Sequence, residues 1–218
     1  FDNAKYKNRR MNNSDPYARY YAFNLKKMPC LEVRQAIYYA WPIKALLDYA
    51  GGEKYAGSYA TGAISPLVAL DYAATKVVGP GSADFKPEGN IEKSKALLEA
   101  AKTKCPDNYA KATSTGFTID VRQSAALNDT IPIVEASFAK AGLKVKWNVI
   151  SVAYYSTVMN PAKQNDMSAS GWGADWANAS TVIPELFTSS GGFNLTQNSD
   201  DPNYKAFEGR VNAAMKQT

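Results

Sequence analysis

Hydrophobic and polar positions alternate most regularly in the middle third of the chain. Residues 117–121 and 143–149 follow the two-residue alternation of β-strands, and 125–141 carries apolar side chains at helical spacing. This is a strand-helix-strand unit of about 33 residues, whose natural geometry is two parallel strands joined by a right-handed crossover. Pro132 falls inside the helical pattern, which favours a helix start near Thr130 or a kink.

The flanking regions add further elements on both sides of this unit. The pattern predicts strands at 17–25 and from 166 onward, and helices at 31–40, 43–50, 91–102 and 202–216. Asn90 is the expected N-cap of the helix at 91–102. Residues 51–65 have no clear period and indicate a long loop, whereas Ser65-Pro66 suits the start of a short helix. Strands alternating with helices indicate an α/β fold.

Length and composition fit one globular domain with extensions. The chain has 218 residues, of which 45% are hydrophobic and 21% charged. No stretch reaches the 18 or more unbroken apolar residues of a membrane span. The chain starts at Phe1 without a signal-like segment, so we expect a processed or excised piece of a longer protein.

Several classes of function lack their characteristic residues. The chain has no histidine, no C-x-x-C spacing and no G-x-S-x-G motif, so we expect no catalytic, metal or cofactor site. The net charge of +5 is spread along the chain, whereas nucleic-acid binding needs a concentrated basic face. Asp166 and Asp175 are the carboxylates that a remote hydrolase hypothesis would use, but the sequence does not bring them together.

The two cysteines, Cys30 and Cys105, leave two possibilities open. In an exported protein they would form a disulfide that closes a loop of about 75 residues, worth roughly 4 kcal/mol in the chain-entropy model. Alternatively they are two unpaired thiols.

Gly171-Trp172-Gly173-Ala174-Asp175-Trp176 is the best candidate for binding. Two tryptophans flank one carboxylate, next to small residues that let a ligand come close. Indole rings offer stacking faces, and an aspartate partly removed from water prefers a cationic partner. These groups suit a ligand with an ammonium group and apolar parts. The same residue types also fit an exposed loop aspartate next to core tryptophans.

Five segments in order resemble the C-terminal lobe of the family 5 extracellular solute-binding proteins, the peptide, dipeptide and nickel receptors of ABC importers. The resemblance covers roughly residues 17 to 215. Its segments are Tyr21-Ala-Phe-Asn24, Val33-Arg-Gln-Ala-Ile37, Ile91-Glu-Lys-Ser-Lys-Ala-Leu-Leu98, Ala141-Gly-Leu-Lys-Val145 and Gly171-Trp-Gly-Ala-Asp175.

The resemblance implies a class II lobe of the periplasmic-binding-protein type, with a mixed, mostly parallel sheet flanked by helices. Residues 17–218 would form one ligand-binding lobe of a two-lobed receptor that closes like a hinge, and 1–16 an extended segment leading into it. The N-terminal lobe would lie outside this sequence. The implied function is capture of oligopeptides or dipeptides outside the membrane for a membrane permease. The implied location is extracellular or periplasmic, with a lipid anchor on the full-length protein.

The resemblance also assigns roles in the candidate loop. Asp175 takes the position of the aspartate that pairs with the α-amino group of a bound peptide, and Trp172, Gly173, Ala174 and Trp176 would line the pocket. Ala169 departs from the pattern, since some oligopeptide receptors carry there an arginine that contacts the ligand's C-terminus. An alternative within the same fold is an oligosaccharide stacked on tryptophan.

Overall fold

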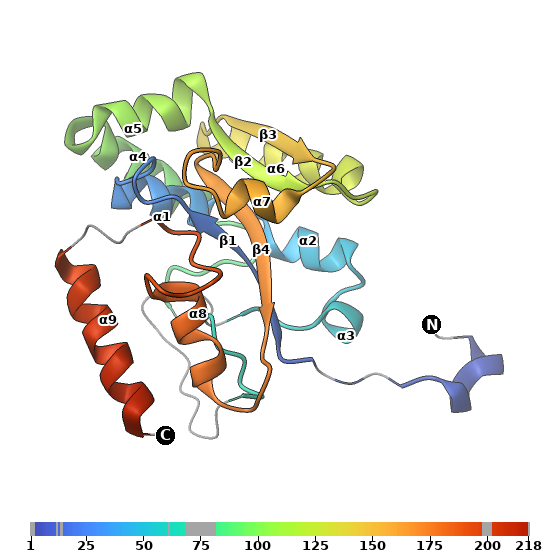
Figure 1. Cartoon of the computed structure of the whole chain (residues 1–218). Coiled ribbons are helices and arrows are strands. Elements are labelled where there is room, and N and C mark those ends of the chain that lie inside the picture. The colour runs from blue at the N-terminus through green and yellow to red at the C-terminus, as the bar shows by residue number, and fades with distance from the viewer. Residues whose placement is uncertain are drawn as a thin grey trace.

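The computed structural model describes residues 3–11, 13, 15–60, 62–68, 82–197 and 202–217 (Figure 1). None of the helices in this part of the chain has the length and apolarity needed to cross a bilayer. The strands are β1 (Tyr17–Phe23), β2 (Phe117–Arg122), β3 (Val145–Ile150) and β4 (Met167–Gly173). The α-helices are α1 (Leu31–Tyr39), α2 (Ile43–Tyr49), α3 (Glu53–Ala56), α4 (Ile91–Lys104), α5 (Pro106–Ala110), α6 (Leu127–Ala141), α7 (Tyr154–Val158), α8 (Ile183–Phe187) and α9 (Pro202–Ala214).

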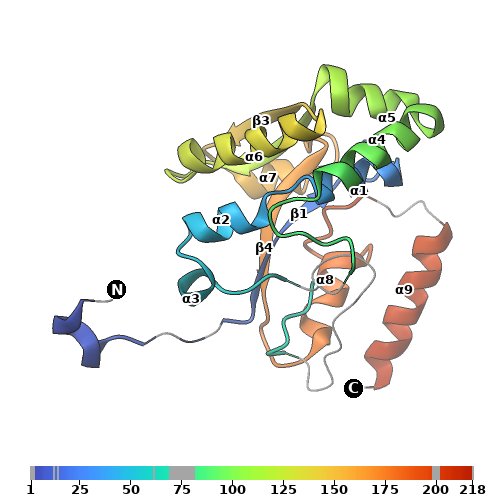
Figure 2. The same ribbon diagram turned by 180° about the vertical axis from the view of Figure 1, so that it is seen from behind.

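A four-stranded sheet in the order β1-β4-β2-β3 forms the centre of the fold. β2 pairs in parallel with β3 and β4, whereas β1 runs antiparallel along the whole of β4. The predicted strand-helix-strand unit is confirmed, because α6 connects the parallel pair β2 and β3. α6 and α7 lie on opposite faces of the sheet (Figures 1 and 2). The α/β class with a mostly parallel sheet flanked by helices is therefore confirmed.

The main core lies between the sheet and the helices α1, α4 and α6. The Phe117 ring of β2 is buried 5.8 Å from the ring of Phe138 in α6, and Trp41 packs edge-on against Phe138 at 5.2 Å. Rings at these separations add favourable contacts to the burial itself. A second, smaller cluster lies around α7 and contains Tyr154, Val158 and Leu195, with Ala22 and Ile150 packed against it.

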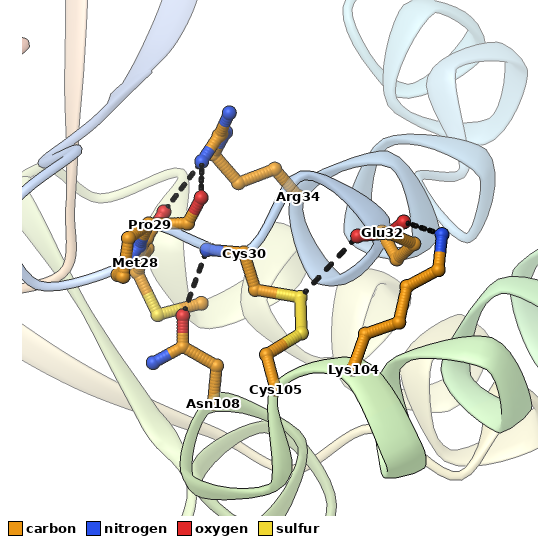
Figure 3. Close-up of a disulfide and its surroundings, with 8 residues drawn as sticks. All are labelled: Met28, Pro29, Cys30, Glu32, Arg34, Lys104, Cys105 and Asn108. Carbon is orange, nitrogen blue, oxygen red and sulfur yellow. Dashed lines mark hydrogen bonds and ion pairs between the residues drawn. A yellow bond between two sulfur atoms is a disulfide. The ribbon is translucent and has the colours of Figure 1, made fainter.

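The two cysteines form a disulfide, which answers the question that the sequence left open. Cys30 precedes α1 and Cys105 stands between α4 and α5, with their Cα atoms 6.1 Å apart (Figure 3). That separation is typical of native disulfides. The bond ties α1 to the junction of α4 and α5.

Of the two alternatives that Pro132 left open for α6, the later start is wrong. The helix begins at Leu127, not near Thr130, so Pro132 is a residue of the helix interior. Proline lacks the N–H that would bond to the carbonyl of Asn128, four residues earlier. Both residues are exposed, so water can reach this carbonyl and the helix tolerates the loss.

The terminal and loop regions also differ from the expectation. Ala4–Arg9 form an exposed 3-10 helix instead of an extended segment, because the Asn3 side chain accepts a hydrogen bond from the Lys5 N–H at 2.9 Å. α3 lies within the predicted loop, and residues 66–68 form a turn instead of a short helix, while 69–81 lie outside the described residues. α5 and the π-helical turn Lys111–Thr115 were not predicted.

Gly191 occupies a position where a side chain would strike the backbone. A Cβ there would lie 2.4 Å from the carbonyl oxygens of Pro184 and Glu185. Gly191→Ala is therefore expected to lower the free energy of unfolding by about 1–3 kcal/mol, measured by urea denaturation. The control is Gly209→Ala in α9, where no atom lies within 4 Å of the added Cβ and alanine should stabilise the helix by about 0.5–1 kcal/mol. Equal stabilities for the two variants would contradict the close turn after α8.

Candidate functional site

β4 separates from β2 after its first two residues but stays in the sheet through β1. It pairs with β2 only at Met167 and Ser168, and then continues paired with β1 up to Gly173. Tyr154 of α7 fills the space where β2 and β4 separate, and its hydroxyl is hydrogen-bonded to the carbonyl oxygens of Asp120, at 3.1 Å, and Ala169. Burial, followed by the nearby Asp120 charge, raises the pKa of Tyr154, so the hydroxyl remains a donor. Beyond Ser168, one edge of β4 has no strand partner within the described part of the chain.

Two hydrogen bonds show which backbone groups of β4 point toward this open edge. The Asp166 carbonyl points to β1, because it accepts the Asn24 N–H at 2.9 Å. The Ala169 carbonyl points to the other side, toward α7. Since the backbone groups of successive strand residues point in alternate directions, those of Gly171 and Gly173 share the direction of Ala169. A peptide in an extended conformation can pair with such an edge.

Two glycines of β4 leave space for the side chain of Tyr17 on the neighbouring strand β1. A Cβ on Gly171 would lie 2.4 Å from the Tyr17 hydroxyl, and one on Gly173 would lie 3.0 Å from the Tyr17 ring. Tyr17 and Gly173 are register partners across β1 and β4. On this face the small size of the glycines makes room for Tyr17, a packing role that the sequence interpretation did not include.

Trp172 lies on the opposite face of β4 and is largely engaged by the protein. Its indole N–H donates to the Thr181 carbonyl at 2.8 Å, and its ring lies 4.9 Å from that of Phe193. Phe193 in turn lies 5.6 Å from the Tyr155 ring of α7. Trp172 is thus a half-buried anchor for the loop after β4, and the exposed part of its ring remains accessible.

Asp175 is exposed at the start of this loop, two residues after β4, and a buried threonine fixes its position. The Asp175 N–H donates to Thr181 Oγ1 at 3.0 Å, and that hydroxyl is 3.3 Å from Asp175 Oδ2. Thr181 is 1% exposed. The carboxylate is therefore oriented by Thr181 on one side and open to solvent on the other. The described residues contain no cationic partner for it within salt-bridge distance.

The remaining loop residues differ in how they are held. Ala174 is half-buried, whereas Trp176 is 55% exposed and donates its indole N–H to Ser180 Oγ at 2.9 Å. The five predicted site residues are consecutive in the sequence, at the end of β4. They therefore lie together because they are neighbours along the chain, not because the fold assembles them. Sequence analysis missed Thr181, Tyr154 and Phe193.

The buried carboxylates serve the fold and do not form an acid-base pair. Asp166 is 2.9 Å from Lys111 Nζ and accepts the Thr118 N–H at 2.8 Å. Asp120 accepts bonds from Asn148 and Asn165. Asp166 and Asp175 stand at opposite ends of β4, and a strand of seven residues spans about 20 Å. Glycosidase carboxylates are separated by less than about 10 Å, so this pair does not support a hydrolase.

Two surface cavities are lined by residues outside 171–176, although the second adjoins this segment through Ser180, which accepts the Trp176 indole N–H. One of about 430 Å³ adjoins the start of α6 and is lined by Ser124, Leu127 and Val149 among others. The other, of about 330 Å³, lies between α8 and α9 and is lined mainly by apolar side chains such as Ile183 and Val211. Neither includes Trp172 or Asp175. Neither Trp172 nor Asp175 is therefore part of a closed pocket in the described residues.

Tyr154 gives a direct test of how the open edge is maintained. Tyr154→Phe removes the hydroxyl that bonds to two main-chain carbonyls. We expect a loss of about 1–3 kcal/mol in the free energy of unfolding, because buried carbonyls lose their donor. The matched control is Tyr155→Phe, since the neighbouring ring is 39% exposed and its packing on Phe193 is retained. Urea denaturation that shows equal effects for both variants would contradict the role assigned to the Tyr154 hydroxyl.

The chain is similar in fold to peptide-binding proteins of known structure. It aligns with a Helicobacter pylori periplasmic binding protein, DppA, in complex with the peptide STSA at 21% identity and a TM-score of 0.64, over 92% of this chain and 36% of that one. It aligns with the Bacillus subtilis oligopeptide-binding protein AppA in complex with a nonapeptide at 21% identity and a TM-score of 0.65, over 92% of this chain and 39% of that one. It aligns with the Escherichia coli murein tripeptide binding protein MppA at 20% identity and a TM-score of 0.63, over 93% of this chain and 40% of that one. No curated protein sequence matches the chain.

These alignments define the class of fold as periplasmic-binding-protein-like, and this chain spans about two-fifths of the length of the three structures. The family model of the bacterial extracellular solute-binding proteins, family 5 (middle region), matches residues 1–194. The chain belongs to this family.

Proposed function

We propose that the full-length protein carrying this chain is the substrate-binding component of an ABC importer, which captures oligopeptides or dipeptides and delivers them to a membrane permease. Family membership and the peptide complexes of the similar structures support this proposal. The observation that carries it is the open edge of β4, which ends next to the exposed carboxylate of Asp175. The chain acts by binding, and no catalytic residue is assigned.

In this proposal the bound peptide lies along β4 as an added strand. Its backbone pairs with Gly171 and Gly173, whose groups point to the open edge, and its terminal ammonium group meets Asp175. Trp172, Gly173, Ala174 and Trp176 line this side of the site. A second, N-terminal lobe of the same protein closes over the ligand and removes it from water. The protein acts outside the cytoplasmic membrane, extracellular or periplasmic, with a lipid anchor as the expected attachment.

Calorimetry with free and N-acetylated forms of one short peptide tests the ammonium contact. Acetylation removes the positive charge and leaves the rest of the peptide unchanged. We expect the full-length protein to bind the free form more tightly by about 2–5 kcal/mol. Equal affinities would remove the ammonium–Asp175 contact from the account.

A second candidate is an oligosaccharide receptor with the same fold. The exposed ring of Trp176 favours it, since indole faces stack on sugars. Titration with cello-oligosaccharides in the same calorimetric series separates the two candidates. Binding of a sugar together with no response to any peptide would replace the peptide proposal with this one.

The 218-residue chain by itself is expected to bind peptides weakly or not measurably. The candidate loop is open on one side, so an apolar ligand would stay largely in water. Titration of the isolated chain checks this expectation. Micromolar or tighter affinity would mean that the site is complete without a second lobe.

A further inference from the structure

A carboxylate lies against the disulfide that joins α1 to the junction of α4 and α5. Glu32 Oε2 is 3.6 Å from the Cys30 sulfur, and its other oxygen is 2.5 Å from Lys104 Nζ. One ligand atom from each of Cys30, Glu32 and Cys105 lies within 4.8 Å of the others. Figure 3 shows the Glu32 carboxylate directed toward the sulfur atoms, with Lys104 beyond it. Neither the peptide site nor the core uses this carboxylate.

We propose that reduction of this disulfide creates a Zn²⁺ site formed by Cys30, Cys105 and Glu32. Two equivalents of a small thiol convert the disulfide to two cysteine thiols and are themselves oxidised to one disulfide. Binding of Zn²⁺ then displaces the two thiol protons to solvent, and both thiolates and the Glu32 carboxylate become ligands. In the oxidised chain the sulfur atoms are bonded to each other, so the site exists only in the reduced state.

The distance between the Cys30 sulfur and the Glu32 carboxylate suits tetrahedral zinc. Bonds of about 2.3 Å to sulfur and 2.1 Å to a carboxylate oxygen place these two ligand atoms about 3.6 Å apart in a tetrahedron. This equals the separation of the Cys30 sulfur and Glu32 Oε2. Two thiolates on one zinc lie about 3.8 Å apart, so the sulfurs must move apart after reduction. The Cα separation of 6.1 Å leaves room for this movement by side-chain rotation. The fourth position remains for water.

The surroundings favour the charged ligands that zinc requires. Cys30 is the N-cap of α1, a helix of nine residues, and a helix N-terminus stabilises a thiolate. Lys104 Nζ lies 2.5 Å from Glu32 Oε1 and holds this carboxylate next to the Cys30 sulfur. Zn²⁺ would replace Lys104 as the partner of Glu32.

The backbone next to the site is held independently of the disulfide. The Cys30 N–H donates to Asn108 Oδ1 at 3.0 Å. Arg34 Nη1 donates to the carbonyls of Met28 at 2.7 Å and Pro29 at 2.6 Å. These bonds join the segment before α1 to α5 and to α1 itself. Cys30 and Cys105, which directly precedes α5, therefore stay close together when the sulfur–sulfur bond is broken.

The sequence contains no metal-binding spacing, which led to the expectation of no metal site. That expectation considered ligands close together along the chain. Here two ligands, Cys30 and Glu32, come from the start of one helix, and the third comes from a position 75 residues later. Only the fold brings these three side chains together.

The test is a Zn²⁺ titration of the 218-residue chain against a chromophoric chelator, after reduction and anaerobic removal of the reductant. We expect one Zn²⁺ per reduced chain and none for the oxidised chain. Glu32→Gln should weaken binding to the reduced chain by about tenfold or more. The matched control is Glu99→Gln, since this exposed glutamate on α4 pairs only with Lys102 among the described residues. The Glu99→Gln variant should bind Zn²⁺ with the same affinity as the unaltered chain.

Far-UV circular dichroism on the same samples covers the possibility that the reduced chain unfolds. In that case Zn²⁺ should restore the helical signal of the unaltered chain, and should do so only at higher concentration in Glu32→Gln. The proposal is overturned if the reduced chain takes up no Zn²⁺. It is equally overturned if Glu32→Gln and Glu99→Gln bind with the same affinity, because the two cysteines would then bind zinc without Glu32.

Discussion

Asp175→Asn in the full-length receptor is expected to weaken the binding of a short peptide with a free amino terminus by about 2–5 kcal/mol. In the proposed mode of binding, the substitution removes the charge that faces the ligand's ammonium group, and the uncompensated ammonium would be enclosed when the proposed second lobe closes. Asparagine retains an oxygen that can accept the hydrogen bond from Thr181, so the loop should keep its shape. Calorimetry at low and moderate salt measures the loss.

The matched control is Asp107→Asn. This aspartate is also exposed, but it lies in α5 and apart from the candidate loop (Figure 1). Its substitution should leave the affinity for peptide unchanged. If both variants bind like the unaltered receptor, Asp175 is not part of the site. If both weaken binding equally, the effect reflects overall charge and not a contact.

Removal of the disulfide is expected to have the largest effect on stability. In the variant with both Cys30→Ala and Cys105→Ala, the unfolded chain regains the freedom of a loop of 75 residues. The chain-entropy model gives a loss of about 4 kcal/mol in the free energy of unfolding. Urea denaturation in the presence of a metal chelator measures it, and the reduced unaltered chain should show a similar loss.

The reduced unaltered chain is the control for packing. Cys30 is 6% exposed, so part of the loss in the double variant comes from its smaller side chain, whereas reduction breaks the bond and keeps both cysteines. We expect the reduced chain to be about as unstable as the double variant. If the free energy of unfolding falls by less than about 1 kcal/mol in both, the disulfide does not stabilise the protein mainly by restricting the unfolded chain.

The elements that the sequence predicted well are those with one buried face. β2, α6 and β3 have regular apolar periods, because one side of each packs on the core. α5 was missed because residues 106–110 are mostly polar and only half-buried or exposed, so they have no such period. The later start considered for α6 was wrong because it treated Pro132 as a boundary, although its position on the exposed side makes it tolerable.

The candidate site was predictable as a segment but not as a geometry. Asp175 and Trp172 could be selected from the sequence because of their neighbours. Thr181 orients Asp175 through a turn, and Tyr154 occupies the gap between β2 and β4, and both contacts depend on how the chain folds back. The direction of the Gly171 and Gly173 backbone groups likewise follows from strand pairing. Pairing between distant strands leaves no local pattern in the sequence.

A crystal structure of the full-length receptor with a bound tripeptide tests the central claim most directly. The measurement is the distance from the peptide's amino nitrogen to the nearer carboxylate oxygen of Asp175. The account predicts about 2.7–3.2 Å, with the peptide backbone paired to Gly171 or Gly173. A peptide bound away from β4, or with its amino group facing another residue while Asp175 remains in solvent, would contradict it.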